Sequence, residues 1–215
     1  MTKQEVLKTL EAKKIVAVVR VDDPVQIYPT VDALLAGGVS IIELTMTIPG
    51  LVDALPVVKE KYGDIITLGV GSVLNRKMAE DVIATGVDFV VSPIMKTEII
   101  DAANEAGVLV AVGAFSPTEI QTAWEAGSDV VKVFPSNVLG PSYIKGVRAP
   151  MPHLKLMPTG GVDVSNVDQW LAAGCVSLGV GSAMVDSKAI KTGNFEVLTE
   201  KAKAFTGAVD AYLNK

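Results

Sequence analysis

The sequence predicts one α/β domain, a (β/α)8 TIM barrel that spans residues 1–215 and carries an extra N-terminal helix. Two observations support this prediction. Short β-branched segments follow glycine at regular intervals, and the stretches between them have helical patterning, so strands and helices alternate strictly. Eight such units with no change of rhythm match a closed barrel, because an open doubly wound sheet usually has about five to seven strands and a switch point.

Glycine marks the expected end of most of the helices. A helix commonly ends with a residue in the left-handed conformation, which glycine adopts without steric cost. Successive glycines are 25, 23, 21 and 20 residues apart, and a last gap of 47 fits two units if it contains a strand. The glycines in question are Gly38, Gly63, Gly86, Gly107, Gly127 and Gly174.

The elements are expected in a simple order. Thr2–Ala12 is a helix that caps the bottom of the barrel, and Asn194–Leu213 is a closing helix. The strands, apolar on both faces as buried parallel strands must be, are Lys14–Val19, Val39–Leu44, Ile65–Leu68, Val87–Val91, Val108–Val112, Asp129–Val133, Leu154–Met157 and Val176–Val180. The helices between them, several with Pro, Ser, Thr or Asn near the start, are Pro24–Ala36, Pro49–Tyr62, Arg76–Thr85, Thr97–Ala106, Pro117–Ala126 and Ser165–Ala173.

The composition excludes several classes of protein. Of the 215 residues, 19 are Lys or Arg and 24 are Asp or Glu, which gives a formal net charge of −5. This acidic balance argues against a nucleic-acid or lipid-headgroup binder, so neither nucleic acid nor a membrane is expected as a partner. Apolar runs such as Val16–Val19 are far shorter than the roughly 18 residues that a membrane helix needs. A content of 49% hydrophobic residues suits a folded chain with a large core.

The cysteine and histidine counts restrict the chemistry further. Cys175 is the single cysteine and His153 the single histidine, so an internal disulfide and a Cys/His zinc site are both excluded. The first residues turn polar where a signal peptide would need an apolar stretch, so export is not indicated and a cytoplasmic location is expected. His153 is expected on the bottom face without a catalytic role, which leaves no Ser-His-Asp triad.

Two charges stand inside otherwise apolar strands. Glu43 follows Ile41 and Ile42, and Lys132 lies among valines just before Phe134. Inward residues of alternate strands share a layer in such barrels, so side chains on strands two and six can meet across the axis. A desolvated lysine is partly neutral and can attack a carbonyl to form a Schiff base, with Glu43 moving the proton. The alternative is a buried ion pair of structural value only, which contributes little stability.

Two glycine-rich turns form the second signal. Thr159-Gly160-Gly161 follows the expected seventh strand, and Gly181-Ser182 follows the eighth. Loops after these two strands commonly bind phosphate in this fold, because glycine lets backbone N–H groups approach an anion and a helix N-terminus adds a favourable dipole. Each turn alone could be a simple tight connection. Their joint position predicts a phosphorylated ligand, and the similar turn that ends in Ser72 is expected near the other end of that ligand.

The residues resemble the class I aldolases for 2-keto-3-deoxy-6-phosphogluconate (KDPG) and 4-hydroxy-2-oxoglutarate (KHG). The resemblance covers nearly the whole chain and rests on Ile15–Arg20, Ala36–Val39, Ile42–Thr45, Val91–Pro93, Val131–Pro135 and Pro158–Val162. It implies that Lys132 forms the Schiff base, that Glu43 is the general acid and base, and that Phe134 is a wall beside the imine. It also implies a homotrimer with no metal and no cofactor.

The resemblance extends to the substrate-binding residues, with some departures. Those expected to bind substrate are Arg20, Thr47, Ser72, Pro93, Phe134, Thr159, Gly160, Gly161, Gly181 and Ser182. Many members of the family carry an arginine for the pyruvate carboxylate where this chain has Thr47. Arg20, at the neighbouring strand end, is expected to bind that carboxylate instead, since a guanidinium can donate two parallel hydrogen bonds; a salt bridge at the rim is the alternative.

The main hypothesis is therefore an aldehyde-lyase that cleaves KDPG to pyruvate and glyceraldehyde 3-phosphate, with KHG as a possible further substrate. An epimeric substrate such as 2-keto-3-deoxy-6-phosphogalactonate is one alternative. A second is a sugar-phosphate isomerase or epimerase that uses the same phosphate turns without a covalent intermediate. A third, a non-catalytic scaffold or ligand sensor, is disfavoured because both Lys132 and Glu43 are present.

Overall fold

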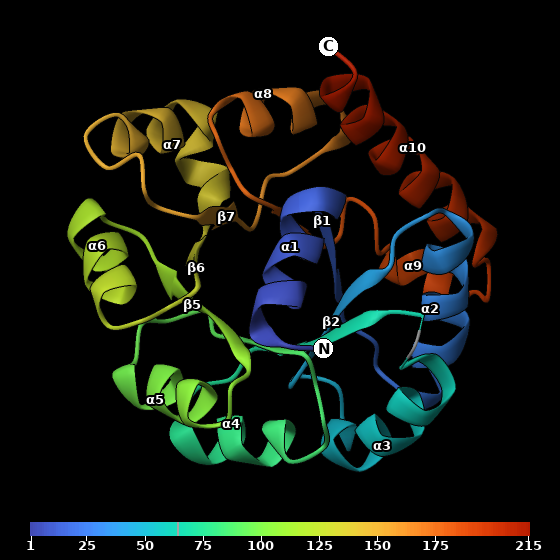
Figure 1. Cartoon of the computed structure of the whole chain (residues 1–215). Helices are drawn as coiled ribbons and strands as arrows, with labels where there is room; N and C mark the ends of the chain where they lie inside the picture. The colour runs from blue at the N-terminus through green and yellow to red at the C-terminus, as the bar shows by residue number, and fades with distance from the viewer. Residues whose placement is uncertain (64) are drawn as a thin grey trace.

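The computed structural model describes residues 1–63 and 65–215, and within these ranges eight parallel strands form a barrel (Figure 1). The strands are β1 (Ile15–Val19), β2 (Ile41–Thr45), β3 (Thr67–Gly71), β4 (Phe89–Val91), β5 (Leu109–Ala114), β6 (Val130–Val133), β7 (Leu156–Pro158) and β8 (Leu178–Val180). Strands β1 to β7 pair in sequence order, and β1 also pairs with β8. A parallel bridge between Thr159 and Gly179 joins the remaining edges, so the sheet closes on itself.

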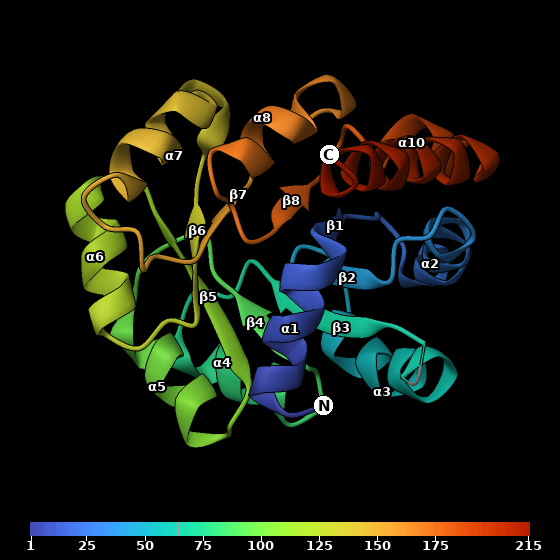
Figure 2. The ribbon, with the colours of Figure 1, turned by 45° about the horizontal axis from the view of Figure 1, so that its top comes forward.

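Helices surround the barrel and connect consecutive strands (Figures 1 and 2). The α-helices are α1 (Lys3–Lys13), α2 (Ile27–Ala36), α3 (Leu51–Tyr62), α4 (Arg76–Ile83), α5 (Thr97–Glu105), α6 (Pro117–Glu125), α7 (Gly140–Arg148), α8 (Val167–Ala172), α9 (Ser187–Lys191) and α10 (Glu196–Leu213). Three short 3-10 helices are η1 (Pro24–Gln26), η2 (Ser136–Val138) and η3 (Val164–Asn166). Helix α10 packs against α2 and α8. The predicted barrel with an extra N-terminal helix is confirmed.

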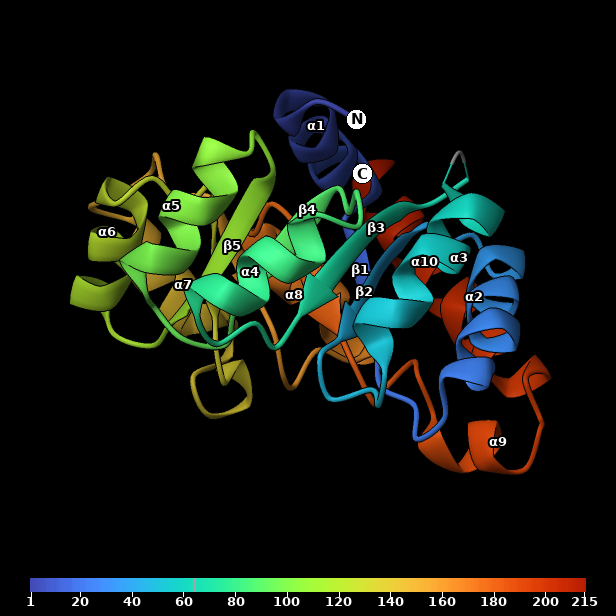
Figure 3. The same cartoon turned by 90° about the horizontal axis from the view of Figure 1, so that it is seen from below.

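Helix α1 covers one end of the barrel, and α9 lies at the opposite end (Figure 3). A capping box between Thr2 and Glu5 starts α1, because each side chain accepts a hydrogen bond from the other residue's backbone N–H. Val6 and Leu10, one helical turn apart, point into the barrel and are buried. Burial of each such side chain contributes about 1.5–3 kcal/mol, so these two residues hold α1 over this end of the barrel.

The barrel interior is apolar at the end that α1 covers and polar at the other. The lower layer contains Val16, Ile41, Phe89, Val91, Leu109, Ala111, Val130 and Met157, which pack against Val6 and Leu10. Glu43 and Lys132 stand two residues farther along β2 and β6 than Ile41 and Val130. Because alternate residues of a strand share one face, these two charged side chains occupy the next interior layer.

The third strand differs from its predicted position. We expected Ile65–Leu68, but β3 covers Thr67–Gly71, and Ile65 is 59% exposed. The two glycines of the expected turn, Gly69 and Gly71, are therefore inside the strand. A methyl group at Gly69 would lie 2.2 Å from the Phe89 ring, so the aromatic side chain occupies the space that a β-carbon would need.

Among the described residues, no helix is both long enough and apolar enough to cross a bilayer. Helices α7 and α9 were not predicted as separate elements. Helix α7 begins with Gly140 and Pro141, and α9 contains only five residues, too few to show a periodic pattern.

Candidate active site

Lys132 and Glu43 meet in the interior of the barrel, as their positions on strands six and two predict. Lys132 Nζ lies 3.8 Å from Glu43 Oε1, and the two side chains are 6% and 1% exposed. Strands β2 and β6 are buried along their whole length, so both charges are enclosed by apolar neighbours. Such a pair is costly to desolvate and adds little stability, so chemistry explains its presence better than stability does.

Each partner has few other polar contacts. Neither carboxylate oxygen of Glu43 has a hydrogen-bond partner among the described residues, although both oxygens are buried. The amine of Lys132 lies 5.3 Å from the centre of the Phe134 ring, within the range of a cation–π contact. The Glu43 carboxylate is therefore free to accept a proton from a molecule that binds next to Lys132.

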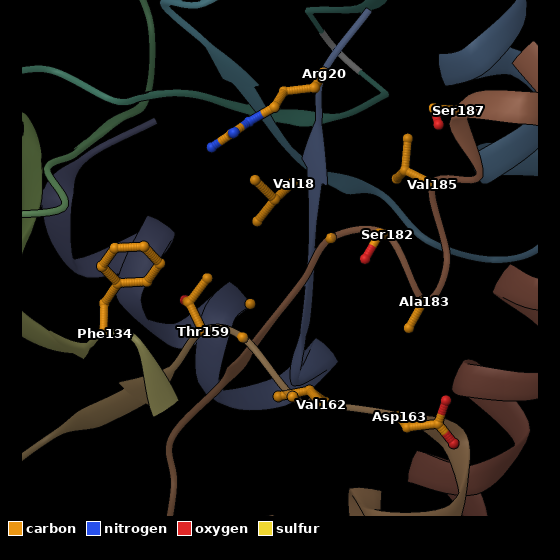
Figure 4. Close-up of a pocket in the computed structure, with 14 residues that line it drawn as sticks. Val18, Arg20, Phe134, Thr159, Val162, Asp163, Ser182, Ala183, Val185 and Ser187 are labelled. Carbon is orange, nitrogen blue, oxygen red and sulfur yellow. The ribbon is translucent and has the colours of Figure 1, made fainter. Parts of the chain in front are cut away.

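A cavity of about 640 Å³ opens at the carboxyl end of the barrel strands (Figure 4). Its wall brings together seven residues from the predicted set, namely Arg20, Phe134, Thr159, Gly160, Gly161, Gly181 and Ser182. Lys132 and Glu43 do not line it directly. Phe134 connects the two regions, because its ring borders the cavity and also lies beside the Lys132 amine.

Arg20 is the cationic side chain of this wall. Its guanidinium extends from the end of β1 into the cavity in Figure 4. Within residues 1–63 and 65–215, no carboxylate forms a salt bridge with Arg20. The alternative of a rim salt bridge is therefore not observed, and the guanidinium is available to an anionic ligand.

The loop after β6 holds the first glycine turn in place. The Ser136 N–H donates to the Thr159 carbonyl over 3.0 Å, and the Ser136 hydroxyl donates to the Gly160 carbonyl over 2.6 Å. The Asn166 amide donates to the Gly161 carbonyl over 2.9 Å. Gly160 and Gly161 have φ values of +97° and +76°, a backbone region that residues other than glycine rarely adopt. These contacts fix the shape of the turn before any ligand arrives.

Aspartate side chains cap the helix N-termini beside the two turns. The sequence predicted that the dipoles of these N-termini would favour a bound anion. The Asp163 carboxylate accepts hydrogen bonds from the Ser165 N–H and hydroxyl, each over 3.0 Å, and these bonds lower its pKa. The Asp186 carboxylate likewise accepts from the N–H groups of Lys188 and Ala189. At both helix starts an aspartate of this chain therefore already accepts hydrogen bonds from backbone N–H groups.

Thr47, Ser72 and Pro93 do not line the cavity, although the sequence groups them with the residues that do. They lie at the ends of β2, β3 and β4. The Thr47 hydroxyl is 2.6 Å from that of Thr45, which donates its own proton to the Val19 carbonyl over 3.2 Å. The Thr47 hydroxyl is therefore held in a hydrogen bond with Thr45 at the end of β2.

Several residues of the site could not be recognised from the sequence. Ser136 directly follows the Val131–Pro135 motif but is not part of it, and its role becomes visible only in its hydrogen bond to the Gly160 carbonyl. Val18, Val162, Ala183 and Val185 complete the apolar part of the wall. A signal for Asp163 and Asp186 did exist, since each stands at a helix N-cap position that favours aspartate.

Two residues set aside on sequence grounds stay away from this site. His153 is exposed and its ring centre lies 5.8 Å from that of Trp124. Cys175 is buried, and burial raises the pKa of its thiol to about 12. The described ranges contain no group of three or more His, Cys, Asp or Glu side chains arranged to hold a metal ion.

Comparison with known proteins identifies the family. The family model for KDPG and KHG aldolase matches residues 6–201. A 2-dehydro-3-deoxy-6-phosphogalactonate aldolase of Escherichia coli is 32% identical over 169 residues, which cover 78% of this chain and 82% of the relative. A 2-dehydro-3-deoxy-phosphogluconate aldolase of Pseudoalteromonas atlantica is 31% identical over 196 residues, which cover 90% of this chain and 91% of the relative.

Solved structures agree with this result. A native KDPGal structure superimposes with a TM-score of 0.87 at 30% identity, covering 94% of this chain and 96% of the other. KDPG aldolase from Legionella pneumophila, with pyruvate captured as a covalent carbinolamine, superimposes with a TM-score of 0.86 at 27% identity and covers 93% and 97%. The chain belongs to the KDPG and KHG aldolase family, whose members are lyases.

Proposed function

We propose that this protein is a class I aldolase that cleaves KDPG to pyruvate and glyceraldehyde 3-phosphate through a Schiff base on Lys132. The observation that carries the proposal is the buried contact of 3.8 Å between Lys132 and Glu43 beneath a cavity bordered by two glycine turns. Family membership supports the reaction class, and the captured pyruvate in the Legionella relative supports a covalent route.

The geometry suits each chemical step. Once it has given up a proton, the Lys132 amine adds to the C2 carbonyl, and loss of water from the carbinolamine gives a protonated imine. Glu43 accepts the proton of the C4 hydroxyl while the C3–C4 bond breaks, and the imine takes up the electron pair as an enamine. The aldehyde leaves, the proton returns to C3, and water then hydrolyses the imine to release pyruvate and the free amine. Phe134 shields the imine from bulk water.

The two ends of the substrate match different parts of the site. Glycine N–H groups at Gly160, Gly161 and Gly181, with the hydroxyl groups of Thr159 and Ser182, suit the phosphate. Arg20 suits the pyruvate carboxylate, because it lines the cavity and its guanidinium can donate two parallel hydrogen bonds. Thr47 suits a substrate hydroxyl, since a threonine hydroxyl can donate or accept a hydrogen bond. Ser72 and Pro93 would then border the keto-acid end.

The decisive experiment is reduction of the protein with borohydride in the presence of pyruvate, followed by peptide mapping. We expect the mass of a reduced pyruvyl group on Lys132 only, and no adduct in the Lys132→Met variant. Lys14, which burial also desolvates in part, serves as an internal control lysine on the far side of the barrel. A folded wild-type protein without an adduct would refute the covalent mechanism.

Substrate choice requires a direct comparison. The relatives include aldolases for both the gluconate and the galactonate epimer, so both epimers are to be assayed side by side with KHG. The isomerase or epimerase alternative is not favoured, because the family and these relatives are aldolases.

We further propose a homotrimer in the cytoplasm. Four large apolar side chains, which we call the apolar rim, are exposed on consecutive loops after β3 to β6: Leu74, Ile94, Phe115 and Val138. An exposed apolar group of this kind suits a contact between subunits. The free, buried thiol of Cys175 is consistent with a reducing compartment.

A further inference from the structure

Gly71, at the end of β3, lies directly against the carboxylate of Glu43. A methyl group at Gly71 would lie 1.8 Å from Glu43 Oε1 and 2.6 Å from its carboxyl carbon. Real β-carbon contacts are never this short, so the carboxylate occupies the volume that any other residue would need. The two strands pair in this region, with Thr45 opposite Gly71.

The backbone does not explain the glycine. Gly71 ends a regular parallel strand and is not among the glycines with positive φ, so any residue could adopt its conformation. Gly181, by contrast, has open space around it, and Gly160 needs its left-handed conformation. The three atoms nearest to an added β-carbon at Gly71 all belong to the Glu43 side chain, so the demand for glycine there comes from Glu43.

The carboxylate has little else to hold it in place. Neither oxygen has a hydrogen-bond partner among the described residues, and its charged neighbour is Lys132 at 3.8 Å. With no directional bonds, its position depends on the attraction to Lys132 and on the volume available. The missing side chain at Gly71 provides that volume.

We infer that Gly71 is a positioning residue, which holds the Glu43 carboxylate within reach of the carbon next to the imine. This inference rests on the proposed roles of Lys132 and Glu43. A methyl group at Gly71 would displace the carboxylate by more than 1 Å, since contacts below 3.0 Å do not persist. A displacement of about 1 Å in a reacting group can cost roughly 100-fold in rate.

The test separates imine formation from proton transfer. The extent of borohydride trapping at saturating pyruvate reports the imine, and the exchange of pyruvate methyl protons with D2O, followed by NMR, reports Glu43. For Gly71→Ala we expect the wild-type extent of trapping but exchange slowed by roughly 100-fold. Glu43→Gln is the reference for lost proton transfer. Gly146→Ala, a glycine in α7 with nothing within 4 Å, is the matched control and should behave as wild type.

A second variant gives a rescue. Aspartate is shorter by one methylene, so Glu43→Asp withdraws the carboxylate from an added methyl group. We expect Glu43→Asp to slow proton exchange by a smaller factor in the Gly71→Ala background than in the wild-type background. If the two substitutions acted independently, Glu43→Asp would slow exchange by the same factor in both backgrounds. If Gly71→Ala does not fold, recovery of folding in the double variant supports the inference, and failure of both overturns it.

The outcomes also distinguish this inference from the proposed function. Absence of trapping in the wild-type protein would overturn the proposed function. Normal trapping with unchanged exchange in Gly71→Ala would overturn the role of Gly71 and leave the Schiff base intact.

Discussion

Substitution of Lys132 or Glu43 affects both the proposed chemistry and the stability of the fold. Both groups are almost completely buried, so removal of one charge leaves the other without a partner in the barrel interior. Breaking a buried pair in this way costs roughly 3–5 kcal/mol. Folding must therefore be checked for any variant of either residue. Glu43→Gln keeps the volume of the side chain and is the more informative substitution.

Arg20 gives a prediction about affinity. Charge-assisted hydrogen bonds contribute about 1.5–3 kcal/mol, so Arg20→Ala should raise the pyruvate concentration for half-maximal trapping by roughly 10- to 100-fold. For Arg20→Lys this concentration should lie between those of wild type and Arg20→Ala. An ammonium keeps the positive charge but lacks the paired donors with which a guanidinium binds both carboxylate oxygens. The measurement is a titration of borohydride trapping against pyruvate.

Lys191 is the control for Arg20. It carries the same charge near the same rim, but it is paired with Asp22 at 2.9 Å and does not line the cavity. Lys191→Ala should therefore leave pyruvate affinity unchanged. Wild-type affinity in Arg20→Ala would mean that the carboxylate binds elsewhere, at the ends of β2 and β3.

At the scale of elements, short connections shape the cavity. Helix α9 has only five residues, yet Ser187 at its start and Val185 just before it both form part of the wall. Asp186 anchors this segment, because its carboxylate caps α9 and forms an ion pair of 2.7 Å with Lys201 of α10. The closing helix thus holds a wall of the site.

Substitution of Asp186 tests this anchor. Asp186→Ala removes both the cap and the ion pair and should lower Tm by roughly 2–4 °C. Asp186→Asn keeps a good N-cap residue and should lower Tm by less than Asp186→Ala does. Circular dichroism during heating measures both variants. Equal Tm values for Asp186→Ala and wild type would show that α9 does not depend on the anchor.

The same carboxylate predicts a pH dependence. The hydrogen bond from Lys201, followed by those from the backbone, lowers the pKa of Asp186 to about 2. A lowered pKa contributes stability that is complete above the unfolded value of about 3.9 and is lost as the pH falls through the folded value. The Tm difference between wild type and Asp186→Ala should therefore be constant near neutral pH and shrink between about pH 4 and pH 2. A difference that persists unchanged at low pH would contradict this assignment.

At the scale of the whole molecule, the apolar rim lies at the end of the barrel that holds the cavity. Its four side chains are between 41% and 67% exposed, and they follow strands that are neighbours in the barrel wall. The rim places large apolar side chains on the loops that follow the strands. Assembly through the rim would bring the subunits together beside their active sites.

Light scattering tests this assembly. The wild-type protein should have about three times the chain mass of 22.5 kDa. Phe115→Asp places a charge on the rim and should yield single chains. Val57→Asp is the control, since Val57 is 51% exposed but lies on α3, away from the rim. A trimer that survives Phe115→Asp, or a wild-type monomer, would refute the proposed contact.

The architecture was predictable because local signals repeat. Glycine with positive φ does follow the helices at Gly38 and Gly174, at φ values of +86° and +92°. Gly63 is the exception, with right-handed backbone at the end of α3. The error in β3 has a physical cause, because its glycines resemble a turn in sequence and are required in the strand by Phe89 and Glu43.

The sequence by itself determined the barrel, the order of its eight strands, the charged residues on strands two and six and the two glycine turns, because each depends on periodicity or on neighbouring residues. Only the tertiary structure decided which side chains share a cavity, that the Thr45 hydroxyl contacts both Thr47 and the Val19 carbonyl, and that the Glu43 carboxylate occupies the space beside Gly71. These features depend on distances between strands that are far apart in the chain. No local pattern encodes such distances, since they arise when the sheet closes.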